Sequence, residues 1–225
     1  EIEKRHFVAP LEWFKKERTL SEKNQMYIEQ SMNFGVKAIE RCLRNDTYLK
    51  EDVAYDEIDA IIFISSTGFA TPSMEARFMN KLPFSETTKR IPIWGLGCAG
   101  GAAGISRAYE YCLAYPSAKV LVVSIELCSL TFQKQDHSKS NLIGTSLFAD
   151  GVACALVAGD AVDVHRISKQ KTIPFITKTS SYLMPDSLDV MGWDVRDEGL
   201  YVIFSRFIPN IIEKWLKLTV EKFLP

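Results

Sequence analysis

Cys98 is the residue whose surroundings most favour chemistry, because it lies among closely spaced glycines. These glycines are Gly95, Gly97, Gly100, Gly101 and Gly104. If a helix begins at Cys98, its unpaired N–H groups and the positive end of its dipole favour the thiolate, which is the nucleophilic form of cysteine. Glycines also permit a sharp turn and the close approach of a substrate or another backbone. The pattern indicates a nucleophile, while composition alone also fits a free cysteine packed in a Gly/Ala helix.

The segments that must position Cys98 alternate between strand and helix patterns. Short apolar runs predict buried strands or extended segments at residues 56–65, 92–95 and 119–126. Apolar residues at helical spacing predict helices over residues 21–44, 73–82 and 98–115. Helices that alternate with buried strands indicate a layered α/β fold around a central sheet.

Towards the C-terminus the same patterns continue. They predict a loop or short helix from residue 144, a strand over 152–158, one or two strands within 164–178, a strand over 199–204 and a helix over 209–223. Near the middle of the chain, Thr71 is a candidate helix cap, because the Pro72 that follows is tolerated in a first helical turn.

Composition narrows the functional classes. With 27 basic and 28 acidic residues the net charge is −1, which provides no long-range field to attract nucleic acid or anionic membranes. A hydrophobic fraction of 47% is typical of a globular protein, and the apolar runs are shorter than the roughly 20 residues of a membrane span. Five widely separated cysteines without a CxxC pair indicate a cytoplasmic location and no metal site.

Four motifs follow one another along the chain. They are SSTGFATP at residues 65–72, GCAGG at 97–101, ELCSLTF at 126–132 and LFADG at 147–151. In this order they resemble the chalcone synthase-like (type III polyketide synthase) family, and bacterial members in particular. The similarity covers most of the chain and continues into residues 192–200. One motif alone is weak, whereas four in order are a strong signal.

This resemblance implies a fold and a reaction. The expected fold is thiolase-type, a layered αβαβα arrangement of two similar halves, usually in a homodimer. Residues 1–225 would form one such region, truncated at both ends, with the N-terminal half and the start of the second. In the expected acyltransferase reaction Cys98 takes an acyl starter from coenzyme A and condenses it with decarboxylated malonyl-CoA. The expected products are alkylpyrones or resorcinols, and no cofactor is implied beyond the coenzyme A thioesters.

Other site residues also follow from the resemblance. Phe148 matches the family's gatekeeper between the coenzyme A tunnel and the initiation cavity, and a core aromatic is the alternative. Ser66 and Thr67 match residues that line the cavity, and Thr71 matches a residue that extends across the dimer interface. For these three, ordinary loop and cap chemistry is the alternative.

The remaining matches concern the shape of the cavity. Cys128 and Thr131 fall where plant members often have threonines, so Cys128 makes the cavity less polar. Gly192 matches a glycine that controls chain-length capacity. Val202 falls near a second phenylalanine of plant members, which favours an aliphatic or fatty acyl starter over a phenylpropanoid.

The family mechanism also needs a histidine and an asparagine, which activate the thiol and stabilise the enolate. His6, His137 and His165 do not lie in a His-Pro-Gly-Gly setting. The family's motifs for these groups belong after Pro225, and its basic residues for the coenzyme A phosphates lie mostly before Glu1. We therefore expect a central fragment that is inactive alone.

Three other functions remain open from the sequence. Initiating β-ketoacyl-acyl-carrier synthases and hydroxymethylglutaryl-CoA synthases share the fold and the buried cysteine. A non-catalytic interaction domain would contain Cys98 only as a packed side chain. A cysteine hydrolase is less favoured, because no histidine partner is evident in the sequence.

Overall fold

The computed structural model describes residues 5–224, which divide into two compact units. Unit 1 contains residues 5–24, 128–150 and 180–224, and unit 2 contains residues 25–127 and 151–179. Each unit is described by itself. No helix within residues 5–224 is both long enough and apolar enough to cross a bilayer.

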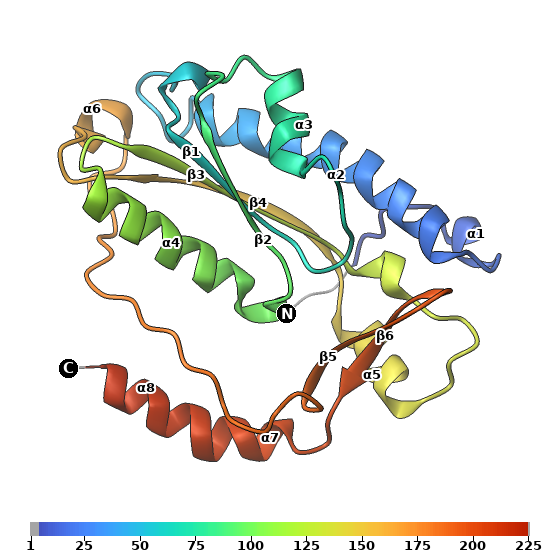
Figure 1. The fold of residues 1–225 in the computed structure, drawn as a ribbon. Coiled ribbons are helices and arrows are strands. Elements are labelled where there is room, and N and C mark those ends of the chain that lie inside the picture. Colours follow the sequence, from blue (N-terminus) through green and yellow to red (C-terminus); the bar gives the residue numbers. More distant parts are fainter. Residues whose placement is uncertain (1–4, 225) are drawn as a thin grey trace. The chain divides into compact units, whose positions relative to one another are not determined.

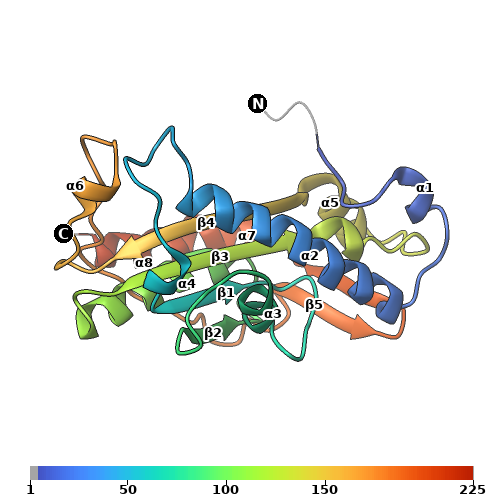
Figure 2. The same cartoon turned by 90° about the horizontal axis from the view of Figure 1, so that it is seen from above.

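Unit 2 is built on a four-stranded sheet in the order β2-β1-β3-β4, which Figure 2 shows from above. The strands are β1 (Ala60–Ile64), β2 (Lys89–Ile93), β3 (Lys119–Leu127) and β4 (Asp150–Ala158). Strand β1 pairs in parallel with both β2 and β3, so that Ile62 lies opposite Ile91 on one side and Val122 on the other. All five residues of β1 are buried, as expected of an apolar strand inside a parallel sheet.

Helices cover both faces of this sheet, with α4 on one face and α2 and α3 on the other (Figure 1). They are α2 (Leu20–Leu43), α3 (Met74–Lys81) and α4 (Gly100–Ala114). A short helix, α6 (Val164–Ile167), follows β4.

The two faces of β1 have separate apolar contacts because strand side chains alternate in direction. On the α4 face, Ile62 and Ile64 pack in one cluster with Ala108 and Cys112 of the helix. On the other face the ring of Phe63 meets that of Phe78 in α3, with centroids 5.9 Å apart. The sheet is therefore a rigid support for the loops at its strand ends.

Unit 1 contains short helices and a hairpin. Its elements are α1 (Leu11–Phe14), a 3₁₀ turn (Cys128–Thr131), α5 (Lys139–Leu147), β5 (Met191–Arg196), β6 (Gly199–Phe204), α7 (Ile208–Ile211), a π-helical turn (Ile212–Leu216) and α8 (Lys217–Phe223). Strands β5 and β6 are antiparallel, with Trp193 opposite Val202. The buried ammonium of Lys23 holds the hairpin turn by donating to the carbonyl of Glu198 at 2.9 Å.

The predicted α/β fold class is confirmed, and most predicted elements match within a few residues. The strands expected within residues 164–178 are wrong. Asp163 instead caps α6 by accepting a hydrogen bond from the Arg166 N–H at 3.2 Å, and irregular chain follows α6. The cap predicted at Thr71 is also wrong, because α3 begins at Met74. Strand β5 was not predicted from its sequence, MGWDVR.

Candidate active site

The end of β1 is tied to β3 by a buried carboxylate. Glu126 accepts hydrogen bonds from the Ser66 N–H at 2.9 and 3.1 Å, from Ser66 Oγ at 3.0 Å and from Thr67 Oγ1 at 2.8 Å. The Leu127 N–H in turn donates to Thr67 Oγ1 at 2.9 Å. Burial raises the pKa of the Glu126 carboxyl, while the hydrogen bonds from Ser66 and Thr67 oppose that rise. The loop after β1 is thus fixed in one conformation.

Cys98 lies at the end of the neighbouring strand, β2. After Ile93 the chain turns through Gly95 (φ +87°) and Gly97 (φ +51°), a backbone region that favours glycine. A 3₁₀ turn at Gly97–Ala99 then leads into α4, which starts at Gly100. Cys98 therefore immediately precedes the helix N-terminus, as predicted, and its side chain is exposed in this chain.

The glycines of this segment have two different surroundings. A Cβ on Gly100 or Gly104 would lie 2.5 Å from the side chain of Ile64, so both glycines allow α4 to pack closely on β1. A Cβ on Gly97 or Gly101 would meet nothing within 4 Å. Close packing on one side therefore positions Cys98, and open space on the other side leaves it accessible.

A cysteine packed in the Gly/Ala helix, the alternative that composition left open for Cys98, is found in this helix at a different position. Cys112 of α4 is buried, with its sulfur 4.0 Å from the carbonyl oxygens of Ala118 and Val157. Burial raises the pKa of the Cys112 thiol, which disfavours its nucleophilic form. The exposed Cys98 is the better placed of the two for reaction with a substrate.

Unit 2 also contains a cavity of about 300 Å³ near the ends of β1 and β2, with Trp94 and Tyr27 in its lining. Glu75 of α3 lines this cavity and is fully buried. Neither carboxylate oxygen of Glu75 has a hydrogen-bond partner among the described residues. Burial accordingly raises the pKa of the Glu75 carboxyl.

Unit 1 contains a mostly apolar cavity of about 200 Å³. It is lined by Phe7, Leu11, Phe14, Cys128, Ser129, Thr131, Phe132, Asn141, Gly144, Thr145, Phe148 and Val202. The structure thus brings together Cys128, Thr131 and Phe148, three residues that the resemblance assigns to substrate binding. Val202, which was expected to make the cavity more aliphatic, also belongs to the lining.

The other predicted binding residues lie elsewhere. Ser66 and Thr67 are buried against Glu126 in unit 2 and line neither of these cavities. Thr71 is exposed on the loop before α3. Gly192 lies on β5, where a Cβ would meet nothing within 4 Å. The roles assigned to these four residues stay predictions.

The sequence interpretation missed the contribution of the N-terminal segment. Phe7, Leu11 and Phe14 all line the unit 1 cavity. Their spacing of three or four residues is an apolar pattern that could have indicated one shared face. The segment is too short for that pattern to distinguish a cavity wall from ordinary packing.

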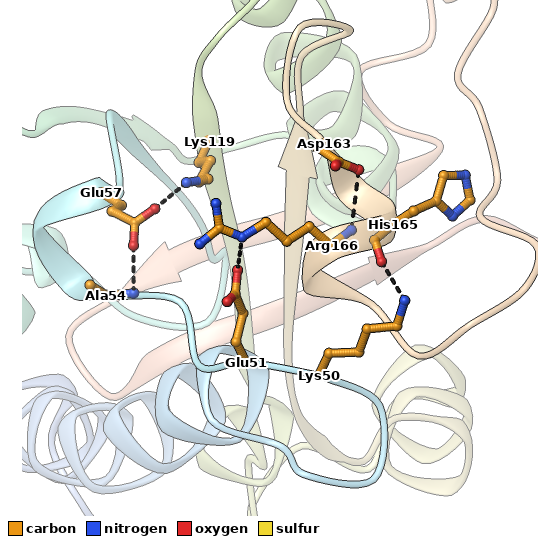
Figure 3. Close-up of polar contacts among 8 residues, drawn as sticks. All are labelled: Lys50, Glu51, Ala54, Glu57, Lys119, Asp163, His165 and Arg166. Carbon is orange, nitrogen blue, oxygen red and sulfur yellow. Dashed lines mark hydrogen bonds and ion pairs between the residues drawn. The ribbon is translucent and has the colours of Figure 1, made fainter.

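His165 belongs to a polar surface cluster, where its carbonyl oxygen accepts from Lys50 Nζ at 2.6 Å and its ring points away from the ion pairs (Figure 3). In the same cluster Arg166 pairs with Glu51 at 2.9 Å, and Glu57 pairs with Lys119. Within residues 5–224 no three His, Cys, Asp or Glu side chains are grouped so that they could hold a metal ion.

Comparison with known proteins identifies the family. Residues 3–161 match the family described as "Chalcone and stilbene synthases, N-terminal domain". The chain belongs to the chalcone and stilbene synthase family. Both the resemblance read from the four motifs and the thiolase-type fold class are thereby confirmed.

Two bacterial relatives illustrate the similarity of this chalcone and stilbene synthase-family chain. It is 56% identical over 224 residues to a putative chalcone synthase of Bacillus subtilis, covering 100% of this chain and 61% of the relative. It is 34% identical over 212 residues to 1,3,6,8-tetrahydroxynaphthalene synthase of Streptomyces coelicolor, covering 94% of this chain and 53% of that protein.

The solved structure of that Streptomyces coelicolor synthase, a bacterial type III polyketide synthase, superposes with a TM-score of 0.86 at 32% identity. The superposition covers 97% of this chain and 59% of the solved one. The chain therefore spans between half and two thirds of the length of the relatives it matches.

Proposed function

We propose that this chain carries the nucleophile of a type III polyketide synthase. The observation that carries the proposal is the exposed Cys98 at the N-terminal end of α4, in a turn that glycines leave open. The Cys98 thiolate attacks the carbonyl carbon of an acyl-CoA, the bond to the coenzyme A sulfur breaks, and coenzyme A leaves as a thiolate that takes up a proton. The starter acyl group is then held on Cys98 as a thioester.

Chain extension follows from the same thioester. Malonyl-CoA loses carbon dioxide, and the enolate carbon that results attacks the acyl carbonyl on Cys98. A carbon–carbon bond forms, the Cys98 sulfur leaves as a thiolate, and the product is a β-ketoacyl-CoA. The enolate needs hydrogen-bond donors and the thiol needs a base, groups that we assign to other parts of the full-length protein.

The substrate class that we propose is an aliphatic acyl-CoA together with malonyl-CoA. Support comes from the unit 1 cavity, whose lining is mostly apolar and includes Phe148 and Val202. Cyclised products would be alkylpyrones or resorcinols. We further propose that the full-length synthase works as a cytoplasmic homodimer on coenzyme A thioesters alone.

The test of this function is covalent loading. Full-length protein is incubated with decanoyl-CoA and measured by intact-protein mass spectrometry and peptide mapping. We expect one decanoyl adduct on Cys98 in the wild type and in a Cys42→Ala control, and no adduct in Cys98→Ala. A wild type without an adduct, or an adduct that persists in Cys98→Ala, would contradict the proposal.

Turnover is a second measurement. We expect the full-length protein to form extended products from decanoyl-CoA and malonyl-CoA, and the 225-residue chain alone to form none. Sustained product formation by the 225-residue chain would show that no group outside it is needed.

A further inference from the structure

Two cysteines that are far apart in the sequence lie together in unit 2. Cys42 is the penultimate residue of α2, and Cys154 is in the middle of β4. Both side chains are half-buried, and neither is in a disulfide. The Cys154 thiol donates a hydrogen bond to the Cys42 sulfur. The fold thus creates a pair of thiols that is separate from the proposed nucleophile, Cys98.

The packing of α2 and β4 places the two thiols on the same side of the sheet. Val157 belongs to the apolar cluster on the α4 face. Because side chains alternate along a strand, Cys154 points to the opposite face, which α2 covers (Figure 1). Ile39 and Leu43 of α2, which flank Cys42 in the sequence, are fully buried. The end of α2 is therefore held firmly against the sheet, beside Cys154.

The contact between the thiols makes the two sulfurs chemically different. Hydrogen bonds from the Cys154 thiol and the Leu156 N–H lower the pKa of the Cys42 thiol, although burial opposes that effect. The hydrogen bond to Cys42 and burial raise the pKa of Cys154. Cys42 therefore forms the thiolate more readily, while Cys154 keeps its proton. A partly accessible thiol of low pKa beside a second thiol is the arrangement found in redox-responsive cysteine pairs.

We propose that Cys42 and Cys154 form an oxidation site, at which a peroxide converts the two thiols into a disulfide that joins α2 to β4. With hydrogen peroxide, the Cys42 thiolate attacks one oxygen, the O–O bond breaks, and hydroxide leaves and takes up a proton to give water. Cys42 is then a sulfenic acid. The Cys154 sulfur attacks the Cys42 sulfur, the S–O bond breaks, and the departing hydroxide takes the Cys154 proton to give a second water. Two thiols are thus oxidised to one disulfide while one peroxide is reduced to two waters.

The first step makes the second step easier. The negative charge of the Cys42 thiolate is one cause of the raised pKa of Cys154. Oxidation to the sulfenic acid removes this charge, so Cys154 then releases its proton more readily. Cys112 gives a contrast within the same unit, because it is buried and burial raises the pKa of its thiol. We expect Cys112 to react slowly with peroxide.

The disulfide would close a long loop of the chain. The segment between the end of α2 and β4 contains the strands β1, β2 and β3. Closing a long loop lowers the conformational entropy of the unfolded chain and so stabilises the folded one. In a reducing compartment the bond would be transient, because thiol–disulfide exchange reverses it. Oxidation at this pair is therefore a reversible way to stiffen unit 2.

The experiment treats the full-length protein with hydrogen peroxide, blocks the remaining thiols with N-ethylmaleimide in denaturant and maps the peptides without reduction. We expect a peptide cross-linked between Cys42 and Cys154, formed about tenfold faster than any oxidation of Cys112. Dithiothreitol should remove the cross-link. We also expect the oxidised protein to melt about 5 °C above the reduced protein.

Variants assign the two roles. Cys154→Ser retains Cys42, and we expect no cross-link but a sulfenic acid on Cys42 that dimedone traps. Cys42→Ala should give neither product. The matched control is Cys98→Ala, which removes the exposed thiol outside the pair. We expect this control to form the cross-link at the wild-type rate and to show the wild-type rise in melting temperature.

Three results for the wild type would overturn the proposal. The first is that peroxide leaves both Cys42 and Cys154 fully reactive to N-ethylmaleimide. The second is a sulfenic acid on Cys42 that does not go on to the cross-link with Cys154. The third is a disulfide that joins two copies of the chain, which a non-reducing gel detects. Because these results come from the wild type, they do not depend on whether the variants fold.

Discussion

Two neighbouring parallel strands of unit 2 end in opposite ways. After β1, Ser65, Ser66 and Thr67 are buried, and Glu126 holds the last two by hydrogen bonds. After β2, the chain from Trp94 to Cys98 is exposed. Of these two adjacent strands, β1 therefore leads to a fixed loop and β2 leads to an accessible thiol. The fold thus provides a fixed loop at the end of β1 and leaves Cys98, after β2, uncovered in this chain.

Glycines have different roles at the two strand ends. At the β1 end, a Cβ on Gly68 would lie 2.2 Å from Cγ of the Tyr27 ring, so this glycine allows close packing. At the β2 end, Gly95 and Gly97 have positive φ and open surroundings, so they allow a turn. The effects on stability of substituting glycines at the two strand ends should therefore differ in both magnitude and cause.

The largest expected effect comes from Glu126→Ala. It leaves the buried Ser66 and Thr67 donors without their acceptor, and we expect a loss of about 3 kcal/mol in the free energy of unfolding. Chemical denaturation measures it. The exposed ion pair of Glu51 with Arg166 gives a matched control, because Glu51→Ala should cost less than about 1 kcal/mol. Equal losses of unfolding free energy in the two variants would mean that the hydrogen bonds of Glu126 stabilise the protein no more than an exposed ion pair does.

The next effect is that of Gly68→Ala. The new methyl group meets the Tyr27 ring well inside contact distance, and overpacking of this kind costs about 2 kcal/mol. A thermal melt of the variant measures the loss. A melt identical to that of the wild type would mean that the β1 end is less tightly packed than its contacts indicate.

A smaller effect is expected for Gly97→Ala at the β2 end. The methyl group has room, so the cost is backbone strain at φ +51°, about 1 kcal/mol. Gly97→Asn should recover part of this loss, because asparagine tolerates left-handed backbone better than alanine. If alanine and asparagine are equally destabilising, strain is not the cause.

Glu75 makes the stability of unit 2 depend on pH. Its pKa is raised above the ordinary 4.5 because the folded protein buries the carboxyl. The stability that goes with the neutral carboxyl is fully present below pH 4.5 and is lost as pH rises through the folded-state pKa. We expect Glu75→Gln to remove this loss, so its advantage over the wild type grows with pH. Chemical denaturation of the wild type and of Glu75→Gln at pH values from about 4 to 8 measures the difference in stability. Parallel pH profiles would contradict it.

The smallest effect is expected for Gly101→Ala, in the first turn of α4. Its Cβ meets nothing within 4 Å, and alanine restricts the unfolded chain more than glycine does. We expect a gain of about 0.5 kcal/mol. A clear loss would show that the open side of α4 is in fact covered in the full-length protein.

Much of the fold could be predicted because its strands and helices have simple patterns. The apolar run that became β1 and the glycine-rich segment before α4 placed Cys98 correctly at a strand-to-helix junction. Residues 164–178 could not be assigned, because the Asp163 cap and not the β-branched composition decides the local structure.

The candidate site was predictable only in part. Motif order pointed to Phe148, Cys128 and Thr131, which do line one cavity. The hydrogen bond from the Ser66 N–H to Glu126 joins residues that are 60 positions apart in the sequence. The hydrogen bond from the Val8 N–H to Asp150 joins residues that are 142 positions apart. Pairings at such separations leave no periodic trace in one sequence, so only the folded chain reveals them.

The position of β2 has a consequence for solubility. It is the outermost strand of the sheet order, next to β1 on one side only. An outer strand is a template on which other chains can aggregate, and proteins reduce this hazard with proline and positive charge. Strand β2 reads Lys89-Arg90-Ile91-Pro92-Ile93, with two cations and a residue that has no N–H to donate. The strand that leads to Cys98 is therefore poorly suited to recruit a strand of another chain.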